Sequence, residues 1–130
     1  MDLPRENVEV TKEQVFELCK QLNLPETLAR IEKDYPAKPF KSDGVSCAPD
    51  RMEGIDLYPA AFRHDLQYWA GQPKSDREEH RLKLLADARL MVDVLEAGGS
   101  HYLADAMFGA VRIGGAAFWH APWSWGFGRR

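Results

Sequence analysis

The sequence has little cysteine, and this excludes two common ways of holding a small protein together. Its 130 residues include two cysteines, Cys19 and Cys47, which are too few for a disulfide framework and lack the paired spacing of a zinc site. A domain of this length buries roughly two-thirds of its unfolded surface on folding. We therefore expect both thiols to be reduced and the core to hold without cross-links.

The sequence also has no long hydrophobic run and no cluster of basic residues. No window reaches the ~18 apolar residues of a membrane span, and the start of the chain lacks the apolar segment of a signal peptide. The net charge is −3, with lysine and arginine scattered along the chain. We expect a protein made in the cytoplasm without a Sec-type signal, with no transmembrane segment and no nucleic-acid partner.

No segment alternates apolar and polar residues over a length that predicts a strand, whereas helical spacing recurs. The sequence therefore predicts one small all-α domain over residues 1–130, with two antiparallel core helices and a long loop. We expect it to divide into N-terminal helices over 1–36, a loop over 37–57, core helices over 58–114 and an aromatic tail over 115–130.

Capping residues and helix breakers predict where the helices begin and end. Thr11 with Gln14 and Ser75 with Glu78 are spaced as capping boxes, and Gly71 stands where a helix C-cap is expected. The predicted helices run from Thr11 to about residue 22, from Pro25 to before Pro36, from Pro59 to about Ala70, from Ser75 to Glu96 or Ala97, and from about Ser100 to Arg112 or Gly114.

The predicted loop over 37–57 is long for a compact domain, and loops of that length are usually functional or disordered. It carries Asp43, Ser46, Asp50 and Asp56. These oxygen-bearing side chains favour a ligand-binding loop. The alternative is structural, because Asp beside Gly and Pro commonly stabilises turns.

Two predicted helices bring candidate catalytic groups together. His64 and Asp65 differ by about 100° around one helix, so they point at different targets. Asp87 is expected, half-buried, at the edge of the next helix's apolar face, or else at a rim where it pairs with Arg or Lys. His64 or Tyr68 could pair with it, leaving one imidazole nitrogen as a general base. That apolar face would consist of Leu84, Leu85, Ala88, Met91, Val92 and Leu95.

Four segments carry a recognisable pattern: SDGVS (42–46), PD (49–50), PAAFRHDLQY (59–68) and AD (86–87). Together they resemble the secreted bacterial and fungal phospholipases A2. In that family a DGCS-like calcium loop precedes a CxRHDxxY helix, and a later aspartate supports the histidine. The similarity covers residues 42–95, and residues 111–115 and 123–128 resemble a subgroup of small uncharacterised bacterial proteins.

The resemblance implies calcium-dependent hydrolysis of an sn-2 acyl ester, with a phospholipid or membrane surface as the substrate. His64 would activate water, Asp87 would orient His64, and Tyr68 would bond to Asp87. Calcium would polarise the ester carbonyl and stabilise the oxyanion. Its implied ligands are Asp43, Asp65 and a carbonyl at or near Val45.

The chain departs from the family at Val45 and Ala61, where the secreted enzymes carry two cysteines bonded to each other, and at residues 68–71, where YWAG replaces Tyr-Arg-Asn. An apolar contact in place of the disulfide suits a protein without a leader, which would reach its substrate after lysis or non-classical export.

Two alternatives to this function stay open. One is a non-catalytic module that binds a protein partner, and the other is a hydrolase of another ester or amide.

The tail has its own alternatives. Its aromatic residues could form a patch at a membrane surface, because Trp favours the interface between lipid and water. More commonly such a cluster packs over the core. The residues concerned are Phe118, Trp119, Trp123, Trp125 and Phe127.

Overall fold

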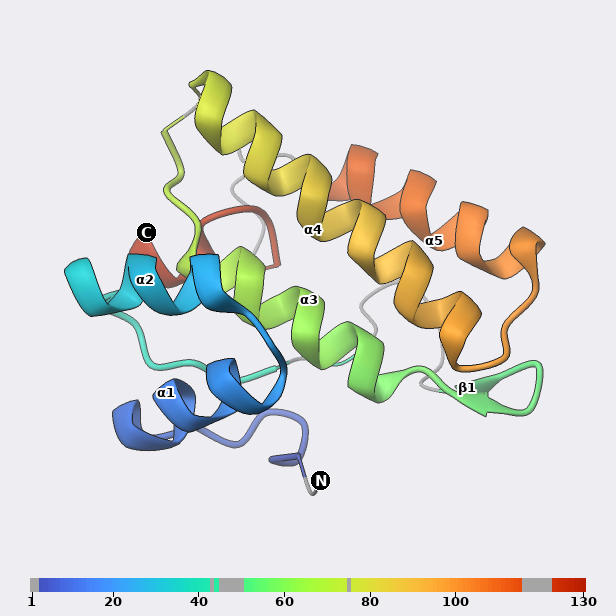
Figure 1. The fold of residues 1–130 in the computed structure, drawn as a ribbon, viewed down its shortest axis with the longest axis horizontal. Coiled ribbons are helices and arrows are strands. Elements are labelled where there is room, and N and C mark those ends of the chain that lie inside the picture. The colour runs from blue at the N-terminus through green and yellow to red at the C-terminus, as the bar shows by residue number, and fades with distance from the viewer. Residues whose placement is uncertain (1–2, 43, 45–50, 75, 116–122) are drawn as a thin grey trace.

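The structure, a computed structural model, describes residues 3–42, 44, 51–74, 76–115 and 123–130. Within these residues the chain is mostly helical, as predicted, with one small antiparallel hairpin (Figure 1). In chain order the elements are α1 (Lys12–Gln21), α2 (Pro25–Lys33), β1 (Arg51–Met52), β2 (Ile55–Asp56), α3 (Tyr58–Ala70), α4 (Arg77–Glu96), α5 (His101–Gly114) and the 3-10 helix η2 (Phe127–Arg129).

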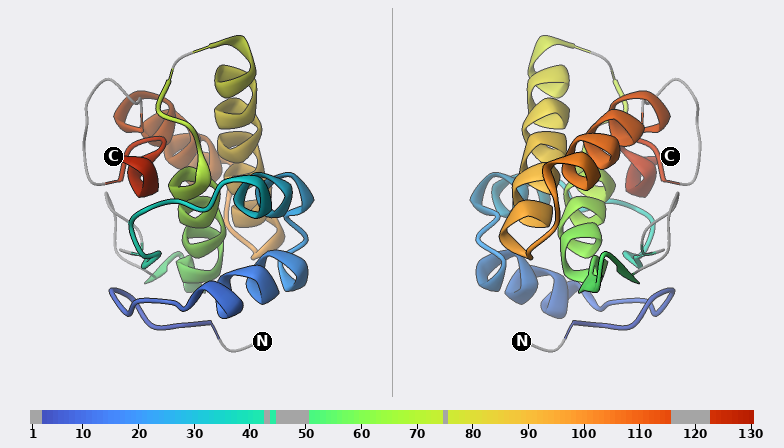
Figure 2. Two further views of the ribbon diagram at one scale, coloured as in Figure 1. Left: turned by 90° about the vertical axis from the view of Figure 1, so that its left-hand side faces the viewer. Right: turned by 90° about the vertical axis from the view of Figure 1, so that its right-hand side faces the viewer.

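Helix α3 lies at the centre of the molecule. Helices α1 and α2 lie on one side of it, and α4 and α5 lie on the other (Figure 1, Figure 2). Helix α4 runs back along α3, and α5 returns along α4, so these neighbours are antiparallel (Figure 1). Most side chains of α3 are buried. This is the pattern of a helix that other elements enclose, and it brings residues of α4 close to the middle of α3.

Apolar side chains pack on both sides of α3. Toward α1 and α2, Phe40 meets Phe62 and Trp69 edge to face, with ring centroids 5.4 Å apart in both pairs. Cys19 is buried there as a free thiol, whereas Cys47 lies outside the described residues. No described helix is long and apolar enough to cross a bilayer. The core toward α4 and α5 contains Leu57, Ala60, Leu90, Val94, Leu103, Ala104 and Met107.

Local signals account for most helix ends. Thr11 and Gln14 form both arms of the predicted capping box on α1, and Ser100 caps α5 through the N–H of Leu103. The predicted box of Ser75 and Glu78 on α4 is wrong. The N-cap is Asp76, whose carboxylate accepts the backbone N–H of Glu79 at 2.9 Å, while Ser75 lies outside the described residues.

The predicted loop over 37–57 contains the hairpin, which the sequence did not indicate because its strands are too short to show alternation. Arg51 pairs with Asp56, and Met52 with Ile55. The two turn residues both have positive φ, as a tight hairpin turn requires: Glu53 at 53° and Gly54 at 77°.

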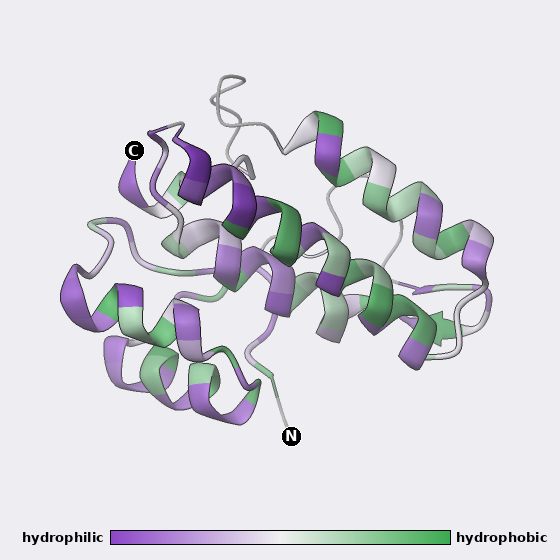
Figure 3. Cartoon of the chain, turned by 45° about the horizontal axis from the view of Figure 1, so that its top comes forward, coloured by the Kyte–Doolittle hydropathy of each residue, from purple (hydrophilic) through white to green (hydrophobic). Residues whose placement is uncertain are grey.

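The buried face of α4 coincides only in part with the predicted apolar one, because Met91 and Leu95 pack against the core but Leu84 and Leu85 do not. Leu84 and Leu85 are 45% and 46% exposed, and Asp87, expected to be half-buried, is completely buried. Apolar residues occur almost all round this helix, so charge pairing decides which side turns inward. In Figure 3 the first turns of α4 are strongly hydrophilic. The buried residues are Glu79, Lys83, Ala86, Asp87, Leu90 and Val94.

Trp125, in the described part of the C-terminal tail, packs against α3 and α4. This side chain is 5% exposed, and its ring lies edge-on to Tyr68 with centroids 5.2 Å apart. Gly71 ends α3 with an ordinary negative φ, so it is not needed as a left-handed cap. It is needed for space, because a Cβ at this position would lie 2.3 Å from the Trp125 ring.

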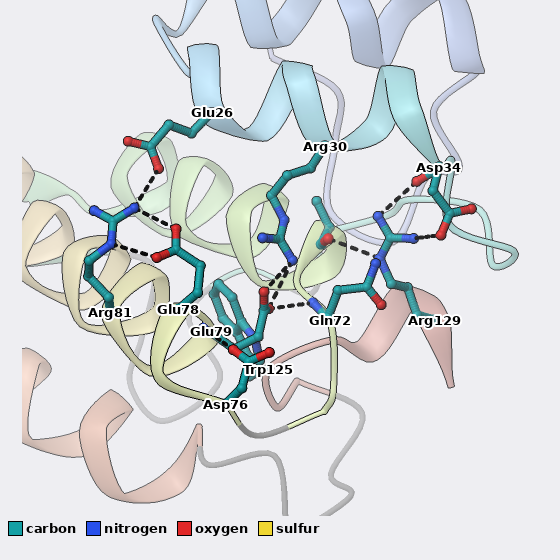
Figure 4. Close-up of polar contacts among 11 residues, drawn as sticks. Glu26, Arg30, Asp34, Gln72, Asp76, Glu78, Glu79, Arg81, Trp125 and Arg129 are labelled. Atoms are coloured by element: carbon teal, nitrogen blue, oxygen red, sulfur yellow. Dashed lines mark hydrogen bonds and ion pairs between the residues drawn. The ribbon is translucent and has the colours of Figure 1, made fainter.

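A buried carboxylate fixes the tail to the rest of the molecule. Glu79 accepts two bonds from Arg30, at 2.7 and 2.9 Å, and one from the backbone N–H of Gln72 at 2.8 Å (Figure 4). The Nε1–H of Trp125 donates to the same carboxylate at 3.0 Å. Trp125 and Phe127 therefore pack over the core, whereas Trp123 is 44% exposed.

Candidate active site

The packing of α3 against α4 brings His64 and Asp87 into hydrogen-bond contact. The Nε2 atom of His64 lies 2.8 Å from Oδ1 of Asp87. His64 is 6% exposed and Asp87 is completely buried. A carboxylate at Nε2 favours the tautomer with its proton on that nitrogen, which leaves Nδ1 as the basic atom. Among the described residues Nδ1 of His64 has no hydrogen-bond partner.

Tyr68 shares the same carboxylate oxygen. Its O–H donates to Oδ1 of Asp87 at 2.5 Å, and its ring centroid is 4.1 Å from that of His64. The pKa of Tyr68 is raised well above its ordinary value, mainly by burial and secondly by the nearby charge of Asp87. The hydroxyl therefore keeps its proton and acts as a donor.

Two cations that the sequence did not single out hold the other carboxylate oxygen. Lys83 Nζ donates to Oδ2 of Asp87 at 3.0 Å, and Arg112 donates to it at 2.9 Å. Lys83 also donates to the carbonyl of Val111 at 3.2 Å, which ties α4 to the last turn of α5. The only sequence signal was local: Lys83 and Asp87 are four residues apart on one helix.

The cluster keeps Asp87 charged although it is buried. Burial alone would raise the pKa of Asp87. Three neighbours outweigh this effect: His64 through its hydrogen bond and charge, Tyr68 through its hydrogen bond, and Lys83 through its charge. The pKa of Asp87 therefore lies below 3.8, its ordinary value. Burial lowers the pKa of Lys83, and Asp87 offsets part of that effect. The partners predicted as alternatives, His64, Tyr68 and a basic residue, all contact Asp87, which is completely buried rather than at a rim.

A mainly apolar pocket of about 100 Å³ lies beside the His64–Asp87 pair. Its polar members are His64, Asp65 and Tyr68, and its apolar walls come from α3, α4 and α5. A pocket with few polar groups that converge on one place is the usual form of a small-molecule site. The apolar walls include Ala61, Leu90, Met107, Ala110, Val111 and Trp123.

Asp65 faces the same pocket from α3. It is 7% exposed, and its Oδ2 accepts the hydroxyl of Ser42 at 2.6 Å. That hydroxyl in turn accepts the N–H of Gly44 at 3.1 Å. These bonds connect Ser42 and Gly44 to Asp65, and Gly44 also lines the pocket. Ser42 belonged to the family-like segment, but no role was predicted for it.

Calcium would need more oxygen ligands than the described residues supply. Asp65 provides one carboxylate, and no group of three acidic, histidine or cysteine side chains with metal-binding geometry occurs among the described residues. Calcium takes six to eight oxygens, many from carbonyls and waters. The other predicted ligands, Asp43 and Val45, lie outside the described residues, so the residues present fit one edge of such a site.

The other predictions for the loop have mixed outcomes. Asp56 has a structural role, because its carboxylate accepts the N–H of Tyr58, the first residue of α3, at 3.0 Å. Ser46 and Asp50 lie outside the described residues. Ala61 is buried on the pocket wall, but its predicted contact with Val45 also falls outside them.

Comparisons with protein-family models, with curated proteins and with solved structures find no match. The chemistry of the site therefore has to be inferred from its own geometry. A buried His–Asp pair with a free Nδ1 can accept a proton from water. Asp65 adds a second carboxylate at the same pocket. A cation bound there could stabilise negative charge on a substrate.

Proposed function

We propose that the protein is a calcium-dependent hydrolase of phospholipid acyl esters, of the phospholipase A2 type. The observation that supports this most is the pairing of His64 with Asp87 beside an apolar pocket that Asp65 also lines. The proposal includes a cytoplasmic origin and action after lysis or non-classical export.

In the proposed reaction His64 is the general base. Its Nδ1 takes a proton from a water molecule whose oxygen attacks the sn-2 carbonyl carbon. The proton then passes from His64 to the leaving alkoxide, and the products are a free fatty acid and a lysophospholipid. Calcium, when bound near Asp65, would supply a Lewis acid for the ester carbonyl.

Asp87 has two roles in this scheme. Its Oδ1 fixes the His64 ring with the proton on Nε2, and its negative charge stabilises the imidazolium that forms when Nδ1 accepts a proton. Tyr68, Lys83 and Arg112 use the remaining acceptor capacity of the carboxylate, which prevents it from rotating. They are positioning residues.

The substrate class is supported by the walls of the pocket. They are mostly apolar, from Leu90 on α4 to Met107 and Val111 on α5, which suits an acyl chain. A pocket of about 100 Å³ holds only part of a long chain, so the rest of a phospholipid would extend beyond it. A hydrolase of smaller esters is therefore the second candidate.

Product analysis tests the proposed function. Phosphatidylcholine vesicles with a labelled sn-2 fatty acid should yield labelled fatty acid and lysophosphatidylcholine in millimolar calcium, detected by mass spectrometry. A parallel panel of soluble esters and amides should react more slowly. Preference for a soluble ester would assign the site to the second candidate, and no hydrolysis of any substrate would leave the non-catalytic alternative.

Calcium should also raise the thermal stability of the protein. A ligand that binds only the folded state stabilises it by about 2.7 kcal/mol at a hundred times its dissociation constant. The measurement is the melting temperature with millimolar calcium and with chelator. Asp65→Asn should lose the shift, whereas Glu32→Gln, which removes an exposed carboxylate from α2, should keep it. A shift that zinc produces and calcium does not would rule out the assigned cofactor.

A further inference from the structure

A second pocket, of about 170 Å³, lies between α2, α3 and α4. No described residue lines both this pocket and the one beside His64. It is called here the α2 pocket, because residues 23–27, at the start of α2, form part of its wall. Each helix contributes residues three or four apart, which share one face of that helix. These pairs are Thr27 and Arg30, Arg63 and Gln67, and Leu82 and Leu85.

The first turn of α2 borders the pocket and has unused donors. Leu24, at the N-cap, has a side chain that cannot accept a hydrogen bond, and no side chain caps the helix. The backbone N–H groups of Glu26 and Thr27 have no hydrogen-bond partner among the described residues. A helix N-terminus with free N–H groups carries partial positive charge, so it favours an anion.

The buried hydroxyl of Thr27 points to a ligand independently of the helix end. Thr27 is 7% exposed and lines the α2 pocket, and its hydroxyl has no hydrogen-bond partner within the described part of the chain. On the α3 wall, the side-chain amide of the half-buried Gln67 also lacks a partner there. Buried polar groups in folded proteins are nearly always hydrogen-bonded. A polar ligand in the pocket would supply the missing partners.

One of the two arginines of the pocket has a free terminal nitrogen. Arg30 reaches from α2 to Glu79 and uses only Nη2 in its two bonds to that carboxylate (Figure 4). Its Nη1 has no hydrogen-bond partner among the residues that the structure describes. Arg63 is bound to Asp93 at 3.3 Å and to the carbonyl of Asn23 at 3.1 Å. Arg30 can therefore donate to an anion while it keeps its pair with Glu79.

The acidic side chain at the pocket has a partner of its own. Among the described residues that line the pocket, Glu26 alone is acidic, and its carboxylate is exposed and pairs with Arg81 at 3.7 Å (Figure 4). The other charged lining residues are Arg30 and Arg63. The unused groups of the pocket are thus mainly donors, which suits the oxygen atoms of a negatively charged group.

We propose that the α2 pocket binds a small organic anion through its carboxylate or phosphate group. The oxygens accept bonds from the free N–H groups of α2, the Thr27 hydroxyl and Nη1 of Arg30. The apolar part of the ligand lies against Leu82, Leu85 and Trp125. Leu85 is 46% exposed, so the pocket opens to solvent on that side. A mainly apolar wall with a few convergent polar groups is the usual form of a small-molecule site.

The test measures binding rather than hydrolysis, so it does not depend on the proposed function. The isotope-labelled full chain is titrated with sodium acetate, sodium hexanoate or hexyl phosphate, and its amide NMR shifts are compared with those in sodium chloride at equal ionic strength. The N–H signals of Glu26 and Thr27 should shift to saturation at millimolar ligand, as expected for ligands of few atoms. Hexanoate should bind about tenfold more tightly than acetate, the effect of burying about two methylene groups. The tighter of hexanoate and hexyl phosphate identifies the anionic group.

Two variants test the named donors. Thr27→Val keeps the shape of the side chain and removes the hydroxyl, and Gln67→Leu removes the amide. Each should raise the dissociation constant of hexanoate about tenfold, the usual effect of losing one hydrogen bond to a charged group. Gln21→Leu, a change at an exposed glutamine of α1 outside the pocket, should leave it unchanged.

Circular dichroism shows whether each variant is folded, and Thr27→Val keeps the test decisive if Gln67→Leu is not. Three results would overturn the proposal. One is a set of shifts at Glu26 and Thr27 no larger than those in sodium chloride. Another is saturable binding that neither variant weakens. The third is a set of hexanoate shifts confined to Leu90 and Met107, which would place the ligand in the pocket beside His64.

Discussion

Asp87→Asn should lower the free energy of unfolding by about 3–5 kcal/mol, the usual cost of removing one member of a buried ion pair. The substitution keeps the shape of the side chain but removes the charge that Lys83 and Arg112 share. Both cations would then lie partly buried without a counter-ion. The measurement is the urea midpoint at neutral pH. Glu32→Gln removes an exposed charge and should change stability by less than about 0.5 kcal/mol.

A double variant separates the ion cluster from simple packing. Adding Lys83→Met to Asp87→Asn removes one unpaired cation, so the double variant should recover part of the lost stability. An additive or larger loss would mean that the pairing of Lys83 with Asp87 contributes little.

The same cluster predicts a pH signature. The folded pKa of Asp87 lies below its ordinary value of 3.8. The stabilisation from its charge is therefore fully present above that ordinary value and is lost as the pH falls through the lower, folded value. Part of the loss of stability below pH 3.8 in the wild type should be missing in Asp87→Asn.

His64→Ala should lower the rate of ester hydrolysis by about 10²–10⁴-fold, the range that a positioned general base contributes. The site has no other described group with a free basic nitrogen in the pocket. The measurement is the initial rate of fatty acid release at saturating calcium. His101→Ala, a change at an exposed histidine at the start of α5, should keep the wild-type rate.

Because His64 is buried, its removal could act through the fold. His64→Gln controls for this, since the glutamine amide can still donate to Asp87. It should melt near the wild-type temperature and be as inactive as His64→Ala. Full activity in either variant would show that His64 is not the base.

The sequence allows accurate prediction where structure is set by a few neighbouring residues. The cap at Thr11, the prolines at 25 and 59, and Ser100 act within one turn, and the helices near them begin within one or two residues of the predicted positions. The spacing between His64 and Asp87 likewise predicts that an antiparallel helix pair brings them close.

The features of the structure that the sequence did not predict depend on contacts between residues far apart in the chain. The inner side of α4 is fixed by Arg112 and Arg30, which lie on other helices and contact Asp87 and Glu79. Nothing in the sequence of α4 alone distinguishes this side from the one that carries Leu84 and Leu85. Apolar periodicity correctly placed Met91 and Leu95 toward the core but also favoured the exposed Leu84 and Leu85, because a charged residue is buried only when its partner is in place.

The most direct test of a calcium-assisted His–Asp hydrolase is the initial rate of sn-2 fatty acid release titrated against free calcium. The predicted curve rises from no activity in chelator to half-activation at about 10⁻⁴ to 10⁻³ M, the range of sites with few carboxylates. Such weak binding would keep the enzyme inactive in the cytoplasm and active after lysis or export. Asp65→Asn should shift the curve to higher calcium or abolish activity. Full activity in chelator, or no release at any calcium concentration, would contradict the proposed mechanism.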